Sequence, residues 1–245
     1  MRERLNNDCT ILGVPVSVVD ESSLLEAISD AVSRREPTVF VGLYAALFRQ
    51  MRADSAYLEL VRRSVTYPDG FGVVRELHKR GLEHAARLAT TDAIAPIARL
   101  AANNGWRVAM YGAAPGVAQR AADALRATAP GVHIVDIRDG YSTAPTAGEL
   151  ERLNADLLLD ALGAGEQESW AYRVAVPAGI SAILTCGGLF DFLAGDKRRA
   201  PAWMQRAGLE WLFRLLLEPR RLFMRYVVGN AVFLRRARAE RRRTA

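Results

Sequence analysis

The sequence predicts an α/β protein with a Rossmann-like, doubly wound, mostly parallel sheet, followed by a basic, amphipathic helical appendage at the C-terminus. Between residues 38 and 188, short apolar runs of strand type alternate with segments of helical periodicity. Parallel strands joined by right-handed crossovers produce this alternation. Half of the 245 residues are hydrophobic, enough for a buried core. We place the core in residues 1–195 and the appendage in residues 196–245, where arginines mix with bulky apolar side chains.

The first part of the core is expected to be extended over residues 10–20. Leu24, Leu25, Ile28 and Val32 then follow one another at helical spacing. The next expected elements are an apolar strand over 38–48, a helix over 49–63, and a short strand over 64–74 that ends in a turn.

The second part of the core is more regular. Pro115 stands near the start of one expected helix and Pro130 after its end, while Thr146 and Glu149 are spaced as a capping box at the start of another. The expected strands cover residues 106–114, 132–141, 156–163 and 180–188, and the expected helices cover 115–130, 146–155 and 166–174.

The polar and glycine positions of interest follow the expected strands. In parallel sheets of this kind, ligands bind beyond the carboxyl ends of the strands. The sequence therefore predicts a binding site at one edge of the sheet. The residues that follow the strands are Asp69, Gly112, Tyr141, Gly163 and Asp191.

Asp69 is the candidate catalytic residue. A carboxylate held at a strand end can act as a general base. The sequence Tyr-Pro-Asp-Gly around it is equally a turn signal, because proline fixes φ and glycine permits positive φ. The two interpretations are compatible with each other.

Gly112 opens the sequence Gly-Ala-Ala-Pro-Gly-Val between a strand and a helix. Backbone N–H groups in such a loop can bind a phosphate. The alternative is close packing of the strand against the helix. The glycine fingerprint of dinucleotide-binding proteins is incomplete here, which argues against a nicotinamide-dependent oxidoreductase.

Three acidic or amide residues have two interpretations each. Gln167 and Glu168 open a helix, where they either reach a ligand or, in the case of the acid, complement the helix dipole. Asp191 lies between two phenylalanines and needs a partner. That partner is either a ribose or base of a ligand or a nearby arginine.

The charge distribution points to an anionic partner. Residues 196–245 contain 14 basic and 4 acidic residues, a net charge of +10, which leaves −4 of the total +6 for the rest of the chain. On a helix, Arg214, Arg221 and Arg225 share one face and neighbour an apolar body, which suits an anionic membrane surface. The alternative is an ordinary terminal helix packed on the core. The Arg-rich end lacks a nucleic-acid reading motif, so we expect no nucleic acid as a partner.

The sequence contains no metal-binding pattern. His78, His84 and His133 are scattered, and Cys9 and Cys186 form neither a disulfide framework nor a Cys-x-x-Cys motif. There is no Walker loop and no Asp-x-Asp. We expect no metal and no cofactor. The N-terminus lacks the apolar core of a signal peptide, and the longest uncharged run, residues 174–190, is short and interrupted; we expect a cytoplasmic, peripheral membrane protein.

Three segments together resemble the WecG/TagA/CpsF glycosyltransferases, glycosyltransferase family 26. They are Pro-Asp-Gly-Phe-Gly-Val-Val from residue 68, residues 107–141, and the block from residue 191 to residue 226. The resemblance covers roughly residues 10–226. It implies an inverting, metal-independent transfer of a sugar from a UDP-sugar donor to a polyprenyl-diphosphate-linked glycan at the cytoplasmic membrane face, in cell-surface polysaccharide biosynthesis. Homo-oligomers are a further expectation from the resemblance.

The resemblance also implies roles for individual residues. Asp69 matches the base, Tyr141 a nucleotide contact and Asp191 a nucleoside contact. Gln167 and Glu168 match a Gln-Glu pair. With Gly112, Arg214, Arg221 and Arg225, these residues form the expected substrate site, and the arginines stabilise the departing UDP.

The chain departs from the family pattern at the expected donor edge. Gly42 and Tyr44 stand where a Thr-x-Asn is usual, Gly165 and Glu166 replace a proline and a commonly basic residue, and Thr90 occupies a glycine position. These changes indicate an altered donor choice or a loss of activity. The rival hypothesis is a non-catalytic, membrane-associated component of a polysaccharide assembly complex that retains the fold.

Overall fold

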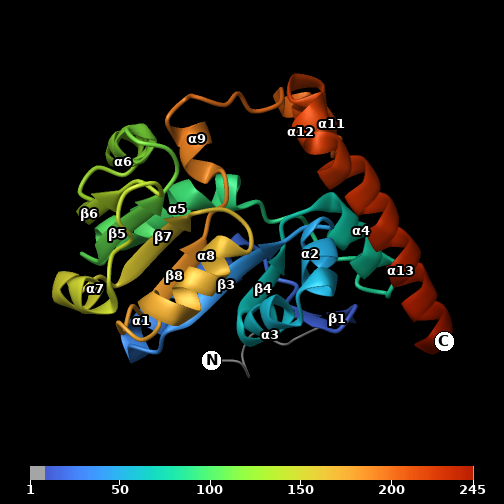
Figure 1. Cartoon of the computed structure of the whole chain (residues 1–245), viewed down its shortest axis with the longest axis horizontal. Coiled ribbons are helices and arrows are strands. Elements are labelled where there is room, and N and C mark those ends of the chain that lie inside the picture. The colour runs from blue at the N-terminus through green and yellow to red at the C-terminus, as the bar shows by residue number, and fades with distance from the viewer. Residues whose placement is uncertain (1–8, 245) are drawn as a thin grey trace.

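A computed structural model describes residues 9–244, without the side chains of residues 202, 206, 221, 225, 226 and 244. Its centre is a six-stranded sheet with strand order β4-β3-β8-β7-β5-β6, in which every neighbouring pair is parallel (Figure 1). The predicted α/β class with a parallel sheet is confirmed. The strands are β3 (Thr38–Leu43), β4 (Val65–Pro68), β5 (Arg107–Gly112), β6 (His133–Arg138), β7 (Leu157–Ala161) and β8 (Ala182–Thr185).

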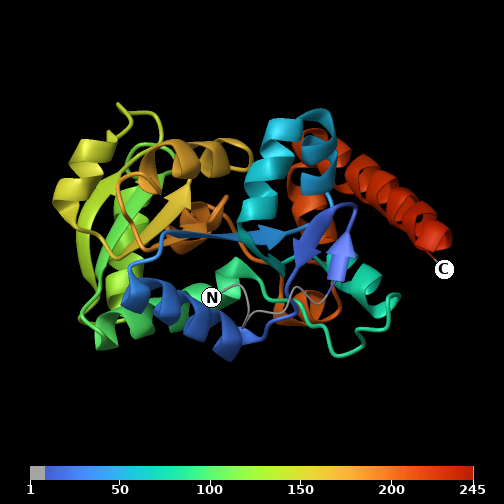
Figure 2. The same cartoon turned by 90° about the horizontal axis from the view of Figure 1, so that it is seen from below.

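Helices cover both faces of the sheet (Figure 2). Successive side chains of a strand point to opposite faces, so Phe40 joins one hydrophobic cluster while Val39 and Val41 join the other. The first cluster includes α1 (Glu21–Arg34), α5 (Thr90–Asn103), α6 (Val117–Thr128) and α9 (Leu189–Leu193). The second includes α3 (Ser55–Arg63), α7 (Ala147–Leu153), α8 (Glu166–Trp170) and the π-helical turn η1 (Ala171–Ala175).

Three elements differ from their predicted form. The predicted helix over 49–63 is wrong, because Asp54 interrupts it and accepts a 3.1 Å hydrogen bond from the N–H of Tyr57; the result is α2 (Leu47–Ala53) followed by α3. The strand expected over 64–74 ends at Pro68, and helix α4 (Phe71–His78) follows. In place of one extended segment over residues 10–20, β1 (Cys9–Ile11) and β2 (Val14–Val16) form an antiparallel hairpin before α1.

The C-terminal segment contains several helices, and its division from residues 1–195 as a separate appendage stays a prediction. An extended connection leads from α9 across to α10 (Ala202–Arg206), α11 (Glu210–Leu217) and α12 (Pro219–Phe223), and the π-helical turn η2 (Met224–Val228) joins these to α13 (Gly229–Thr244) (Figure 1). The last helix packs on the second hydrophobic cluster, because Phe233 is buried and its ring centroid lies 4.8 Å from that of Phe48 in α2. Among the described residues, no helix is both long and apolar enough to span a membrane.

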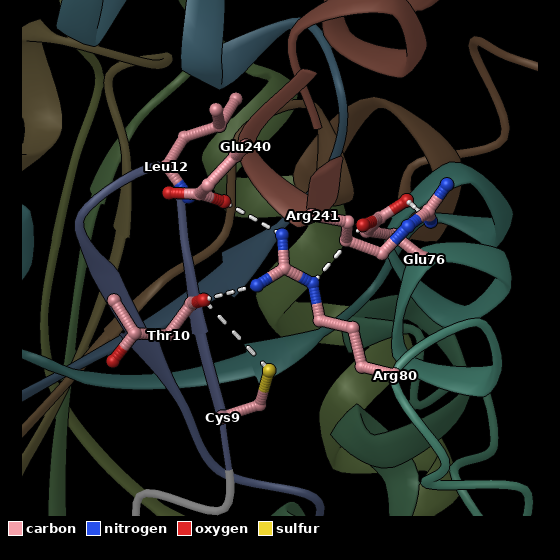
Figure 3. A network of polar contacts seen from close by, with 7 residues as sticks. All are labelled: Cys9, Thr10, Leu12, Glu76, Arg80, Glu240 and Arg241. Atoms are coloured by element: carbon pink, nitrogen blue, oxygen red, sulfur yellow. Dashed lines mark hydrogen bonds and ion pairs between the residues drawn. The ribbon is translucent and has the colours of Figure 1, made fainter. Parts of the chain in front are cut away.

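A network of ion pairs fixes α13 to the rest of the molecule (Figure 3). The carboxylate of Glu76 in α4 is 1% exposed and binds Arg80 at 3.0 Å and Arg241 at 2.7 Å. Glu240 accepts hydrogen bonds from Arg80 at 2.6 Å and from the N–H of Leu12 at 2.9 Å. The network therefore joins α13 to both α4 and the N-terminal hairpin.

Candidate active site

A pocket of about 1040 Å³ lies at the carboxyl ends of the strands, which is the size of a cleft for a small-molecule ligand. Loops after β4, β5, β7 and β8 form its floor, and α9, α11 and α13 contribute its walls. Of the residues expected to follow the strands, Asp69, Tyr141, Gly163 and Asp191 all line this pocket.

Asp69 is a pocket residue between β4 and α4. The N–H groups of Asp69 and Gly70 donate to the carbonyl of Leu43 at 3.0 and 2.9 Å, so the segment after β4 is held against the end of β3. A Cβ on Gly70 would lie 2.7 Å from the Cβ of Tyr44, so only glycine fits there. The structure does not show the predicted turn, because Gly70 is extended, with a φ of −105°, and its N–H donates to Leu43 of β3. Asp69 lines the pocket, and its role as the base stays a prediction.

The surroundings of Asp69 tune its carboxyl group. Burial raises its pKa, the positive charge of Arg87 opposes the rise, and Glu210 adds to it. Thr90 donates to Oδ2 at 3.4 Å, and Arg87 donates from Nε to the Asp69 carbonyl at 2.8 Å. A carboxylate with a raised pKa is a better proton acceptor than an ordinary surface aspartate. The site can therefore deprotonate a hydroxyl group.

Gly112 and Tyr141 are positioned differently. Gly112 has a φ of +126°, and a Cβ there would lie 2.4 Å from the carbonyl carbon of Ala161, so this glycine permits close contact between β5 and β7. Ala113, next to it, lines the pocket, and Gly112 does not. Tyr141 lines the pocket and its side chain is 80% exposed, on a loop in which Asp139 accepts the N–H of Tyr141 at 2.9 Å.

Gln167 and Glu168 mainly hold the chain together in this structure. Gln167 lines the pocket, accepts the N–H of Gly187 at 2.9 Å and donates to Glu168 at 2.8 Å. Glu168 is fully buried outside the pocket lining, and its carboxylate accepts the N–H of Gly165 at 2.7 Å at the start of its own helix. Their binding roles stay predictions.

The far wall of the pocket carries positive charge. Lys197 forms a short ion pair with Asp191, so the partner that the sequence demanded for this acid is a lysine. The guanidinium carbon of Arg214 lies 5.1 Å from the ring centroid of Phe192. The predicted side chains of Arg221 and Arg225 lie outside the described residues.

The departures from the family pattern fall into two groups. Gly42, Tyr44 and Thr90 line the pocket next to Asp69. Gly165 and Glu166 do not line it, and Glu166 instead pairs with Arg173 at 3.9 Å. The first group is therefore the one placed to change substrate choice.

Sequence reasoning missed Arg87, Lys197 and Glu210, all of which line the pocket. Arg87 belongs to no motif, and it meets Asp69 only through the fold. Lys197 and Glu210 stood within the block that carries the family resemblance, but no pattern separated them from their neighbours. Within residues 9–244, no group of three or more His, Cys, Asp or Glu side chains is arranged to hold a metal ion.

A parallel α/β sheet with a polar pocket at its carboxyl edge is the usual arrangement of nucleotide-binding enzymes. A model of the "Glycosyl transferase WecG/TagA/CpsF family" matches residues 9–245. The chain belongs to this family, as the sequence resemblance indicated.

Two curated relatives share the name "N-acetylglucosaminyldiphosphoundecaprenol N-acetyl-beta-D-mannosaminyltransferase". The protein of Bacillus subtilis (strain 168) is 33% identical over 171 residues, which are 68% of this chain and 66% of the relative. That of Bacillus spizizenii (strain ATCC 23059 / NRRL B-14472 / W23) is 33% identical over 158 residues, 63% of this chain and 61% of the relative. The matches span just under two thirds of the relatives' length.

Proposed function

We propose that the chain is an inverting, metal-independent glycosyltransferase that moves a sugar from a UDP-sugar to a polyprenyl-diphosphate-linked glycan in cell-surface polysaccharide biosynthesis. One observation carries the proposal: a carboxylate with a raised pKa, Asp69, lines the same pocket as the cations Lys197 and Arg214. The names of the two relatives describe transfer to a diphosphoundecaprenol-linked sugar, which supports a lipid-linked acceptor here.

In the proposed reaction Asp69 accepts the proton of the acceptor hydroxyl group. The hydroxyl oxygen forms a bond to the anomeric carbon of the donor sugar, while the bond from that carbon to the UDP oxygen breaks. The electron pair of the broken bond stays on the departing diphosphate. Attack from the side opposite UDP inverts the anomeric configuration.

The leaving diphosphate needs fixed positive charge, because preorganised cations stabilise charge that develops in the transition state. Arg214 and Lys197 are in the pocket to supply it. We propose that Arg221 and Arg225 join them. Gly112, Tyr141, Gln167, Glu168 and Asp191 remain our proposed donor-site residues, and the exposed ring of Tyr141 is available to stack on a nucleobase.

The appendage, residues 196–245, is proposed to dock on an anionic membrane surface and to complete the site. Five of its apolar side chains are at least half exposed: Trp203, Leu216, Leu217, Phe223 and Met224. Apolar side chains next to arginines suit the interface of an anionic bilayer. Docking at the inner face of the cell membrane would bring the lipid-linked acceptor to the pocket.

Vesicle sedimentation tests the membrane proposal. The chain should bind vesicles rich in phosphatidylglycerol and should release as salt is raised, with pure phosphatidylcholine vesicles as the control. Replacing Leu216 and Leu217 by serine should weaken binding while the fold, followed by circular dichroism, is kept. Equal binding of the double variant would refute this surface.

Turnover on a panel of UDP-sugars with membrane-extracted polyprenyl-diphosphate glycans tests the enzyme. Asp69→Asn should keep UDP binding and lose transfer, while Asp123→Asn, on the surface of α6, should transfer like the wild type. An active Asp69→Asn variant would remove Asp69 from its role. Absence of UDP binding would remove the proposed donor.

The second candidate function is a non-catalytic component of a polysaccharide assembly complex. It is favoured by Gly42, where β3 reaches Asp69 without a side chain: a Cβ there would lie 3.0 Å from Asp69 Oδ2. Gly42 therefore offers no side chain that could bind the Asp69 carboxylate. UDP binding without transfer from any donor would favour this candidate.

A further inference from the structure

Arg87 lies between two carboxylates that come from distant parts of the chain. Its Nη2 is 2.9 Å from Oε2 of Glu210 and 4.0 Å from Oδ1 of Asp69. Glu210 is the first residue of α11 in the appendage, and it is 8% exposed. The guanidinium group of Arg87 thus lies closer to the carboxylate of Glu210, in the appendage, than to the carboxylate of Asp69.

The position of Arg87 is fixed by two further contacts. Its Nε donates to the backbone carbonyl of Asp69 at 2.8 Å, and its guanidinium carbon lies 5.2 Å from the ring centroid of Phe71. These contacts keep the guanidinium beside the pocket whether or not Glu210 is present. The N–H groups at its far end are the ones that the two carboxylates share.

Glu210 is itself held in place. Its second oxygen, Oε1, lies 3.7 Å from Nε of Arg199, and Arg199 donates to Asp92 of α5 at 2.7 Å. Glu210 is therefore held by another residue of the appendage, Arg199, through one carboxylate oxygen and binds Arg87 through the other. Its carboxylate competes with Asp69 for one cation.

We propose that Glu210 is a positioning residue that acts through Arg87: it binds the guanidinium and keeps it from pairing closely with the Asp69 carboxylate. This inference rests on the proposed role of Asp69 as the base. A base that is closely paired with an arginine is a weak one. Because Glu210 belongs to α11, the Asp69 carboxylate is more basic while the appendage lies over the pocket than it would be without the appendage.

The electrostatics of the described residues agree with this geometry. The pKa of Asp69 is raised first by burial, is lowered by Arg87 and is raised again by Glu210. The groups that face Asp69 from the packed elements are Arg87, Glu210, the hydroxyl of Thr90 and the phenol of Tyr67. A close opposite charge typically lowers a carboxyl pKa by about 1–3 units, so release of Arg87 from Glu210 should be measurable.

The first experiment compares the pH dependence of kcat/KM, which reports the free enzyme, in the wild type and Glu210→Gln. The substitution keeps the shape and removes the charge. We expect the acid limb to move down by about one pH unit and the plateau rate to fall several-fold. Glu210→Asp, which keeps the charge, should return the acid limb toward the wild type. Glu218→Gln removes an equal charge from the other end of α11 and should leave the acid limb unchanged.

The second experiment does not depend on turnover. The carbon-13 signal of the Asp69 carboxyl group, assigned with Asp69→Asn, is titrated in the full-length wild type and in Glu210→Gln. A lower titration midpoint in the variant supports the action of Glu210 on Asp69 through Arg87. If the lower midpoint is found in a chain that transfers no sugar, this electrostatic coupling stands and the proposed function fails.

Two results would overturn the proposal. One is an unchanged Asp69 titration in Glu210→Gln. The other is a variant that loses turnover with the acid limb in its wild-type place, since Glu210 would then serve only to hold the appendage.

Discussion

Arg241, near the end of α13, donates a 2.7 Å hydrogen bond to the carboxylate of Glu76 in α4, which is 1% exposed (Figure 3). Arg80 binds the other oxygen of the same carboxylate. One buried acid thus receives two cations, one from the turn that follows its own helix and one from the C-terminal helix. The position of α13, and with it the wall of the pocket that α13 forms, depends on Glu76.

Glu76→Gln should destabilise the protein. Removing one partner of a buried ion pair leaves the other charge uncompensated, which costs about 3–5 kcal/mol; we expect about 3 kcal/mol, because Arg80 keeps Glu240. Urea unfolding measures the loss. Arg242→Ala, an exposed neighbour on α13, should change stability by no more than about 0.5 kcal/mol. Equal stability of Glu76→Gln and the wild type would mean that the pair contributes nothing.

Gly112→Ala should cost more than a positive φ alone explains. At Gly112 a Cβ meets the backbone of Ala161 at 2.4 Å, whereas at Gly131, with a φ of +91°, nothing lies within 4 Å. Gly131→Ala should therefore lose only the cost of left-handed backbone, about 1–2 kcal/mol. Thermal unfolding of both variants compares the cost of the left-handed backbone alone, at Gly131, with that cost plus the steric clash at Gly112. Similar losses in the two variants would contradict the close contact of β5 and β7.

Asp160→Asn should change how stability depends on pH. Asp160 is fully buried, its Oδ2 has no hydrogen-bond partner among the described residues, and burial raises its pKa well above the ordinary value. The wild type therefore loses stability as pH rises from the unfolded pKa, about 3.9, through the raised folded pKa. The asparagine variant does not titrate, so its relative stability should grow with pH in this window. Parallel stability curves would show that Asp160 stays charged.

The regular part of the sheet could be predicted because its strands are apolar on both faces. The runs around Met110 and Leu158 read as strands without any tertiary information, and both residues are buried. The capping box of Thr146 and Glu149 is also confirmed, since both of its hydrogen bonds are local. Local patterns of this kind survive folding unchanged.

The helices α4 and α5 and the break at Asp54 were not predicted. Asp54 gives no apolar or proline signal, and its effect depends on a side-chain hydrogen bond to the N–H of Tyr57. Arg87 and Glu210 are 123 positions apart in the sequence, and only the fold brings the guanidinium of Arg87 into contact with the carboxylate of Glu210. Asp69 could be predicted as a pocket residue from its motif, whereas Arg87 and Glu210 beside it could not.

Thr90→Val should shift the pKa of Asp69 in the direction opposite to the shift expected for Glu210→Gln. Thr90 donates its one hydroxyl hydrogen to Asp69 Oδ2, at 3.4 Å, and so accepts from the buried hydroxyl of Tyr67 at 2.8 Å. Its hydrogen bonds lower the pKa of Asp69. Valine keeps the shape and removes the donor, so the pKa of Asp69 should rise further and the acid limb of kcat/KM should move to higher pH.

The same variant leaves the Tyr67 hydroxyl buried without its partner, which costs about 1–3 kcal/mol of stability. Adding Tyr67→Phe removes the unpaired hydroxyl and should recover part of that stability, with the shifted acid limb retained. If the double variant recovers stability but keeps the shifted acid limb, the Thr90 hydroxyl acts on Asp69 itself. An acid limb that returns to its wild-type position with Tyr67→Phe would instead trace the shift to disturbed packing.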